Sequence, residues 1–149
     1  METNEMIEKL NSLIRLDNDA LSSYNKVIDV IDEPTLKTEI TRFRDDHKRH
    51  VSVLSELVKS YGGSPSTQEK DIRGVFLGGA TALQSLFGVE GALKALQTGE
   101  KVTNKNYSDA VQWNVPEDVK IVLRDNYGDE QRHLRFVETA LRDKVWEKR

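Results

Sequence analysis

The chain has three histidines, and all of them stand near acidic residues at helical spacing. His47 and His50 lie three residues apart in the stretch DDHKRH, and His133 follows Glu130 by three residues in the stretch DEQRH. Residues three apart share one face of an α-helix, so each pair can present two side chains to one centre. Imidazole and carboxylate groups both bind divalent metals, and the two pairs therefore predict a metal site.

These two pairs belong to an internal repeat with an offset of 83 residues. The matched polar positions are Asp17 with Glu100, Tyr24 with Tyr107, Asp46 with Asp129, His47 with Glu130, Arg49 with Arg132, and His50 with His133. Apolar positions such as Leu10 with Leu93 follow the same offset. We infer that one helical hairpin has been used twice.

The elements that must position these residues are helices, because apolar residues recur at spacings of three and four along nearly the whole chain. Long helices are expected over residues 5–31, 34–61, 89–113 and from just after Pro116 to about residue 147, with a shorter one over 71–87. Tight turns join each hairpin, and Gly62 and Gly63 suit a left-handed helix cap. The expected fold is all-α: a single domain, 1–149, forming a four-helix bundle of two hairpins with a helical crossover between the second and third long helices.

Six ionisable residues fall within the apolar stripes of the four long helices. They are Asp17, His47, His50, Glu100, Glu130 and His133. Burying an uncompensated ion costs several kcal/mol, against a net domain stability of only about 5 to 15 kcal/mol. The pattern therefore predicts a positive partner in the bundle interior, and one or two metal ions are the simplest choice.

Composition excludes several other classes of protein. The net charge of -3 and the isoelectric point near 5.7 argue against a nucleic-acid binder, which would concentrate lysine and arginine. The absence of cysteine excludes thiolate metal sites and cysteine nucleophiles. No apolar run approaches the ~20 residues of a membrane span, and the acidic start METNEMIEKL does not resemble a signal peptide, so we expect a cytoplasmic protein.

The sequence as a whole resembles the ferritin-like di-iron carboxylate proteins, in which one carboxylate from each of two helices joins a Glu-x-x-His pair from each of the other two. The segments DNDALSSY, FRDDHKRH, EGALKALQTGEKVTNKNY and NYGDEQRH are more narrowly similar to a bacterial ferritin-like group filed as a domain of unknown function. The resemblance implies terminal carboxylate ligands at Asp17 and Glu100, a bridging ligand at Glu130, and nitrogen ligands at His50 and His133.

His47 departs from that pattern, because it stands where the superfamily usually has a second bridging glutamate. The candidate ligand set thus holds three carboxylates and three imidazoles. An imidazole cannot bridge two metals as a carboxylate does. Iron, as one ion or two, is the first expectation, while zinc and manganese remain open.

Two candidate functions stay open, the first of them suggested by the resemblance. The first is an iron-dependent oxidoreductase, ferroxidase-like or peroxidase-like, that oxidises ferrous iron with dioxygen or peroxide in stress protection. The second is a non-enzymatic bundle with a structural zinc ion or a buried polar network, acting in assembly or the stress response. Whether the protein is an enzyme, and whether it forms a homodimer, stays open from the sequence.

Several nearby polar residues have simpler interpretations. Tyr24 and Tyr107 are expected to be core tyrosines whose hydroxyls find an acceptor. Asp46 and Asp129 could orient histidines, but the favoured interpretation is a solvated or ion-paired flank. Asp19 competes with Asp17 as a ligand and ranks lower, because its helical phase points away from the stripe.

Overall fold

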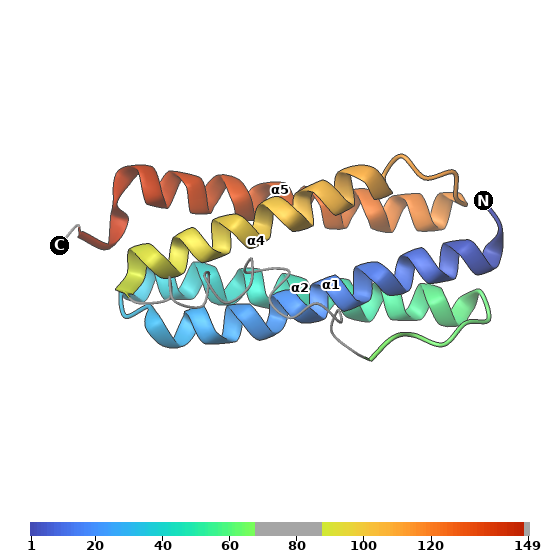
Figure 1. The fold of residues 1–149 in the computed structure, drawn as a ribbon, viewed down its shortest axis with the longest axis horizontal. Helices are drawn as coiled ribbons and strands as arrows, with labels where there is room; N and C mark the ends of the chain where they lie inside the picture. The colour runs from blue at the N-terminus through green and yellow to red at the C-terminus, as the bar shows by residue number, and fades with distance from the viewer. Residues whose placement is uncertain (68–87, 148–149) are drawn as a thin grey trace.

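The computed structural model describes residues 1–67 and 88–147, in which four long α-helices run side by side (Figure 1). The elements are α1 (Thr3–Val30), α2 (Pro34–Ser60), α4 (Gly88–Ala110), α5 (Glu117–Asp143) and the short 3-10 helix η1 (Val145–Glu147). These described residues contain no β-strand, so the predicted all-α fold is confirmed. Nor does any helix among them combine the length and apolar character that crossing a membrane requires.

The helices form two hairpins that pack against each other. α1 packs on α2 and α4 packs on α5, while the contacts of α1 with α4 and of α2 with α5 close the bundle (Figure 1). The end of α2 and the start of α4 lie at opposite ends of the bundle, as a lengthwise crossover between the hairpins requires. The crossover helix expected over residues 71–87 lies outside the described residues.

Proline and glycine residues set the two ends of α2 close to the positions predicted from the sequence. Pro34 opens α2, and the Glu33 side chain accepts a hydrogen bond from the backbone N–H of Leu36, as an N-cap does. Gly62 follows α2 with a φ of +89°, the left-handed conformation that glycine adopts without steric cost.

The expected ends of the third and fourth long helices need correction. α4 ends at Ala110 rather than near residue 113, because the amides of Gln112 and Trp113 bond three residues back and the last turn tightens. α5 ends at Asp143 rather than near residue 147, because Lys144 takes a left-handed conformation with a φ of 48°. That conformation interrupts the helical hydrogen-bond pattern, and the chain continues as η1.

Two apolar clusters fill the bundle interior on either side of a polar centre. One gathers residues such as Val27, Leu36 and Leu93, and the other gathers residues such as Leu10 and Leu54. All of these side chains are fully or almost fully buried. The clusters supply the hydrophobic stabilisation of the fold, and they also keep the polar centre between them away from water.

Two glycines provide a matched test of this packing. A Cβ on Gly63 would lie 2.8 Å from Cγ2 of Ile7, whereas a Cβ on Gly128, on the exposed face of α5, would meet nothing within 4 Å. Gly63→Ala should lower the free energy of unfolding by about 1 to 3 kcal/mol through overpacking. Gly128→Ala should raise it by about 1 kcal/mol through helix propensity. Urea denaturation of both variants measures the difference, and equal effects would contradict the close approach of α1 to Gly63.

Candidate metal centre

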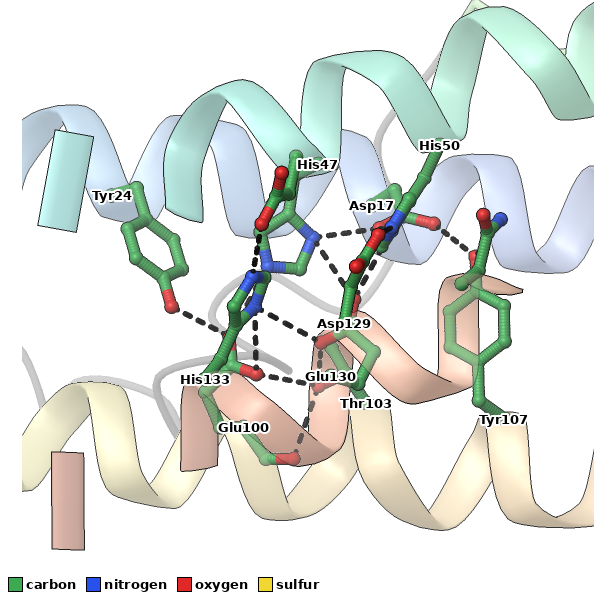
Figure 2. Close-up of polar contacts among 12 residues, drawn as sticks. Asp17, Tyr24, His47, His50, Glu100, Thr103, Tyr107, Asp129, Glu130 and His133 are labelled. Atoms are coloured by element: carbon green, nitrogen blue, oxygen red, sulfur yellow. Dashed lines mark hydrogen bonds and ion pairs between the residues drawn. The ribbon is translucent and has the colours of Figure 1, made fainter. Parts of the chain in front are cut away.

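The six ionisable residues predicted as ligands meet in the middle of the bundle, where all of them have fully buried side chains. α1 contributes Asp17, α2 contributes His47 and His50, α4 contributes Glu100, and α5 contributes Glu130 and His133. Figure 2 shows these side chains turned toward one another from the four helices. Each comes from the apolar stripe of its helix, which is why ordinary core packing brings them together.

Their ligand atoms form two overlapping groups. The first group consists of Asp17, His47, His50 and Glu130, and the second of His47, Glu100, Glu130 and His133. Within each group, one nitrogen or carboxylate oxygen per residue lies within 4.8 Å of those of the others. His47 and Glu130, which are repeat partners, belong to both groups. This arrangement is compatible with two adjacent metal ions that share ligands.

His47, which belongs to both groups, contacts one carboxylate found only in the first group and one found only in the second. Its Nδ1 is 2.7 Å from Oδ1 of Asp17, and its Nε2 is 3.1 Å from Oε1 of Glu100 (Figure 2). An ionised carboxylate can only accept a hydrogen bond, so both contacts are satisfied when both ring nitrogens carry a proton. In the metal-free protein this imidazolium ring is the cation that joins the two carboxylates.

His50 and His133 are each held from behind by an aspartate of the opposite hairpin. Nε2 of His50 is 2.9 Å from Oδ2 of Asp129, and Nε2 of His133 is 2.8 Å from Oδ2 of Asp46. These contacts leave Nδ1 of each ring facing the centre, 3.2 Å from Asp17 Oδ1 for His50. A hydrogen bond at the outer nitrogen fixes the orientation of a ligating histidine, so this is a favourable geometry for metal binding.

Asp46 and Asp129 therefore do more than the sequence interpretation assigned to them. Each is ion-paired with Arg49 and Arg132, as a charged flank would be, and each also contacts a buried histidine. The favoured interpretation as simple flanks was incomplete. The repeat contained the missing signal, since Asp46 and Asp129 keep their identity at the same offset as the candidate ligands.

The two tyrosines connect the hairpins in the same reciprocal way. The Tyr24 hydroxyl donates to Oε1 of Glu100, and the Tyr107 hydroxyl donates to Oδ2 of Asp17, each over 2.7 Å. Both tyrosines are fully buried, as expected for core tyrosines that find an acceptor. The acceptor in each case is a candidate ligand of the other hairpin, which sequence analysis did not predict.

Two buried polar atoms at the centre have no hydrogen-bond partner among the described residues. They are Oε1 of Glu130 and Nδ1 of His133. The other carboxylate oxygen of Glu130 accepts a hydrogen bond from the Thr103 hydroxyl over 2.8 Å. Their nearest charged contacts are ion pairs without hydrogen-bond geometry, at 3.2 Å from Glu130 Oε1 to His50 Nδ1 and 3.5 Å from His133 Nδ1 to Glu100 Oε2. A metal ion would satisfy a carboxylate oxygen and an imidazole nitrogen at once. The residues present therefore fit a divalent metal.

Asp19 is itself buried, with 5% of its surface exposed, although its helical phase points away from the stripe that carries Asp17. It does not belong to either group of converging ligand atoms in the described part of the chain. The lower rank given to Asp19 as a ligand agrees with this placement, because Asp19 is buried away from the stripe that carries Asp17.

Burial and charge act in opposite directions on the ionisable groups at the centre. Burial disfavours the charged His47 ring, but the negative charge of Glu130 and the hydrogen bond with Asp17 outweigh it and raise the pKa of His47 to about 9. The pKa values of His50 and His133 are raised in the same way by neighbouring carboxylates. Burial also opposes ionisation of Asp17, but the positive charge of His50 and the His47 hydrogen bond lower its pKa. Without metal, the protonated imidazoles thus balance the carboxylates.

A four-helix bundle with histidines and carboxylates converging in its core is the arrangement found in ferritin-like di-iron proteins. The chain is similar in fold to a crystal structure from Bacillus anthracis str. Ames that is described as "ferritin like, diiron-carboxylate proteins". The TM-score is 0.74 and the sequence identity 23%, over 95% of this chain and 99% of that chain. The expected ferritin-like fold is thereby confirmed.

The profile of the family described as Domain of unknown function (DUF2383) matches residues 5–113, well over half of the chain. The chain belongs to this family, in agreement with the resemblance noted from its sequence. The match includes Asp17, His47, His50 and Glu100, whereas Glu130 and His133 lie beyond it. No curated protein matches the chain.

The metal-free protein should have a stability maximum near pH 5 to 6.5. The folded pKa of His47 is about 9, above the ordinary value of about 6.5, so its stabilisation is complete below pH ~6.5 and is lost as the pH rises through 9. The lowered pKa values of Asp17 and Glu100 act oppositely, and their stabilisation is lost as the pH falls below about 4.

Urea midpoints of chelator-treated protein between pH 4 and 10 test this dependence. The His47→Gln variant is the control, because it lacks the titrating ring and should show a smaller decline above pH ~6.5. A midpoint that stays constant from pH 6.5 to 9 in the unaltered protein would contradict the proposed charge balance.

Proposed function

We propose that this protein binds two iron ions in the bundle core and oxidises ferrous iron with dioxygen or peroxide. The observation that carries the proposal is the overlap of the two ligand groups at His47 and Glu130. Similarity in fold to a structure described as a diiron-carboxylate protein supports iron as the metal. The protein would then act in protection against oxidative stress or in metal handling within the cytoplasm, as a single-domain oxidoreductase.

Each candidate ligand has a role that follows from its position. Asp17 and His50 would serve one ion, Glu100 and His133 the other, and Glu130 would connect the two positions. Glu130 suits a shared role because its Oε1 lies 3.2 Å from His50 Nδ1 while its Oε2 lies 3.7 Å from His133 Nδ1. His47 would supply a nitrogen ligand in place of the more usual bridging carboxylate.

Ferrous iron, as the substrate, would supply one electron per ion, and two electrons with two protons reduce dioxygen to hydrogen peroxide or, in the peroxidase-like reaction, peroxide to water. The chain supplies the surroundings for this reaction. The two apolar clusters exclude water from the centre, which strengthens its electrostatic interactions. Tyr24 and Tyr107 hold Glu100 and Asp17 in place, and burial together with the adjacent carboxylates raises the pKa of each tyrosine, so both stay protonated donors.

A second candidate function is a non-enzymatic bundle held together by a structural zinc ion or by the polar network alone. The observation in its favour is that protonated histidines satisfy nearly all of the carboxylates without any metal. Three imidazoles among six ligands also suit zinc, and manganese is a further alternative. In this case the reciprocal contacts between the hairpins would fasten the bundle, and the protein would act through its surfaces.

Chelator-treated protein is titrated anaerobically with ferrous iron, and its oxygen uptake is then measured on exposure to air. These two measurements separate the two candidate functions. The proposal predicts binding of about two ferrous ions per chain and consumption of oxygen or peroxide. Stoichiometric zinc binding without iron oxidation would support the structural role instead, and absence of bound metal would support the polar network.

The Glu130→Gln variant locates the bound metal. It keeps the size of a residue common to both ligand groups and removes its charge, so metal affinity should fall by roughly tenfold or more. Asp19→Asn is the matched control, since it neutralises a buried carboxylate outside both groups, and it should keep the full metal content. Circular dichroism shows whether each variant folds. Equal metal loss in both would contradict the assigned centre.

His47→Glu tests the meaning of the unusual histidine. The change exchanges a nitrogen ligand for carboxylate oxygens, which favour iron and manganese over zinc more than imidazole does. The ratio of bound iron to bound zinc should therefore rise when the two ions compete in an anaerobic solution, as measured by elemental analysis. A ratio that is unchanged or moves toward zinc would show that His47 does not set metal preference.

A further inference from the structure

Two surface hollows are lined by residues of α2 and α5 and are related by the internal repeat. The first has a volume of about 390 Å³ and is lined by Glu39, Arg42, Phe43, Asp45, Asp46 and Arg132. The second has a volume of about 410 Å³ and is lined by Arg49, Val53, Val122, Asp125, Asn126 and Asp129. We call them the Phe43 hollow and the Asn126 hollow, because these two residues occupy equivalent positions at the 83-residue offset.

Size and charge do not distinguish the two hollows. The Phe43 hollow is lined by three carboxylates and two guanidinium groups, and the Asn126 hollow by two carboxylates and one guanidinium group. Each therefore carries an excess of one negative charge, which attracts cations weakly. The buried residue at the equivalent position, Phe43 in one hollow and Asn126 in the other, does distinguish them.

In the Phe43 hollow that residue is an aromatic ring. Phe43 is 3% exposed, and its ring stacks on the ring of His133 with the centroids 4.4 Å apart. Phe136 packs edge-on against the Phe43 ring, with the ring centroids 5.2 Å apart. A cation passing here would have to shed its water against apolar carbon, which offers no replacement ligands.

In the Asn126 hollow the equivalent residue is a polar amide. Asn126 is 4% exposed, and its Nδ2 donates to the Tyr107 hydroxyl over 3.2 Å. That hydroxyl donates in turn to Oδ2 of Asp17 over 2.7 Å. Polar atoms thus run without interruption from this hollow to a candidate ligand, and oxygen atoms along such a route can replace the water of a divalent cation.

Asp129 provides a second connection from the same hollow. Its carboxylate lines the hollow and is 2.9 Å from Nε2 of His50, which belongs with Asp17 to the first ligand group. The Phe43 hollow has the equivalent connection, since Asp46 lines it and is 2.8 Å from Nε2 of His133. The two aspartates therefore do not distinguish the hollows, and the difference between them lies at Phe43 and Asn126.

We propose that divalent metal ions reach the centre through the Asn126 hollow, and that the Phe43 ring closes the equivalent route from the Phe43 hollow. The inference rests on the metal binding proposed above and adds the path by which the metal arrives. It assigns Asn126, Asp125 and Asp129 to metal uptake, with Asn126 as the residue that makes the path polar.

Stopped-flow uptake of cobalt(II) by chelator-treated protein tests the proposal, with the visible absorption of bound cobalt as the readout. Asn126→Leu should slow uptake by roughly tenfold, since a leucine side chain removes the polar link. Release of cobalt to an added chelator should slow by the same factor, so the dissociation constant should hardly change. A weakened affinity with normal uptake would mean that Asn126 merely supports Tyr107, and would overturn the proposal.

Two surface variants keep the test free of folding effects. Asp125→Asn and Asp45→Asn each remove one exposed carboxylate, the first from the Asn126 hollow and the second from the Phe43 hollow. Uptake should slow about two- to threefold in Asp125→Asn at low salt and stay normal in Asp45→Asn. Equal rates in the two variants would overturn the proposal.

The outcomes also separate this proposal from the proposed function. If the unaltered protein binds no cobalt at equilibrium, the metal centre itself is wrong and the route falls with it. If the protein binds cobalt and Asn126→Leu takes it up at the normal rate, the centre stands and only the route is wrong.

Discussion

The burial of six ionisable side chains between two apolar clusters is the constraint on which the rest of this structure depends. The carboxylates among them must meet positive charge in a region that water does not reach, since uncompensated buried charge would exceed the stability of the fold. Protons on the imidazoles meet this need in the metal-free protein, and divalent metal would meet it in their place. Metal binding and proton release are therefore linked, because a nitrogen cannot hold a proton and a metal together.

The duplicated hairpin explains how such a centre can be built from few kinds of contact. Tyrosine to carboxylate and histidine to aspartate each occur twice, and each joins one hairpin to the other. Because every one of these bonds crosses between the hairpins, the centre fixes how the two halves align. The same groups that could hold a metal thus also specify the tertiary structure.

Departures from the repeat make the two halves unequal. His47 stands where the other half has Glu130, and Phe43 stands where the other half has Asn126. Thr103, which donates to Glu130, has an alanine as its repeat partner at position 20. One side of the centre is consequently more polar and the other more apolar. A symmetric ancestral hairpin pair would offer two equal metal positions with equal access, whereas these substitutions differentiate them.

The sequence by itself determined the helices, their buried stripes, the repeat and the six residues that share the interior, because periodicity along one helix depends only on local geometry. It also pointed to the family, through motifs that stay close in the chain. It did not determine that Tyr24 meets Glu100, that Asp46 holds His133, or that Asp19 is buried. Those contacts depend on the rotation and axial register of one helix against another, which side-chain packing across the whole bundle sets, and only the tertiary structure decided them.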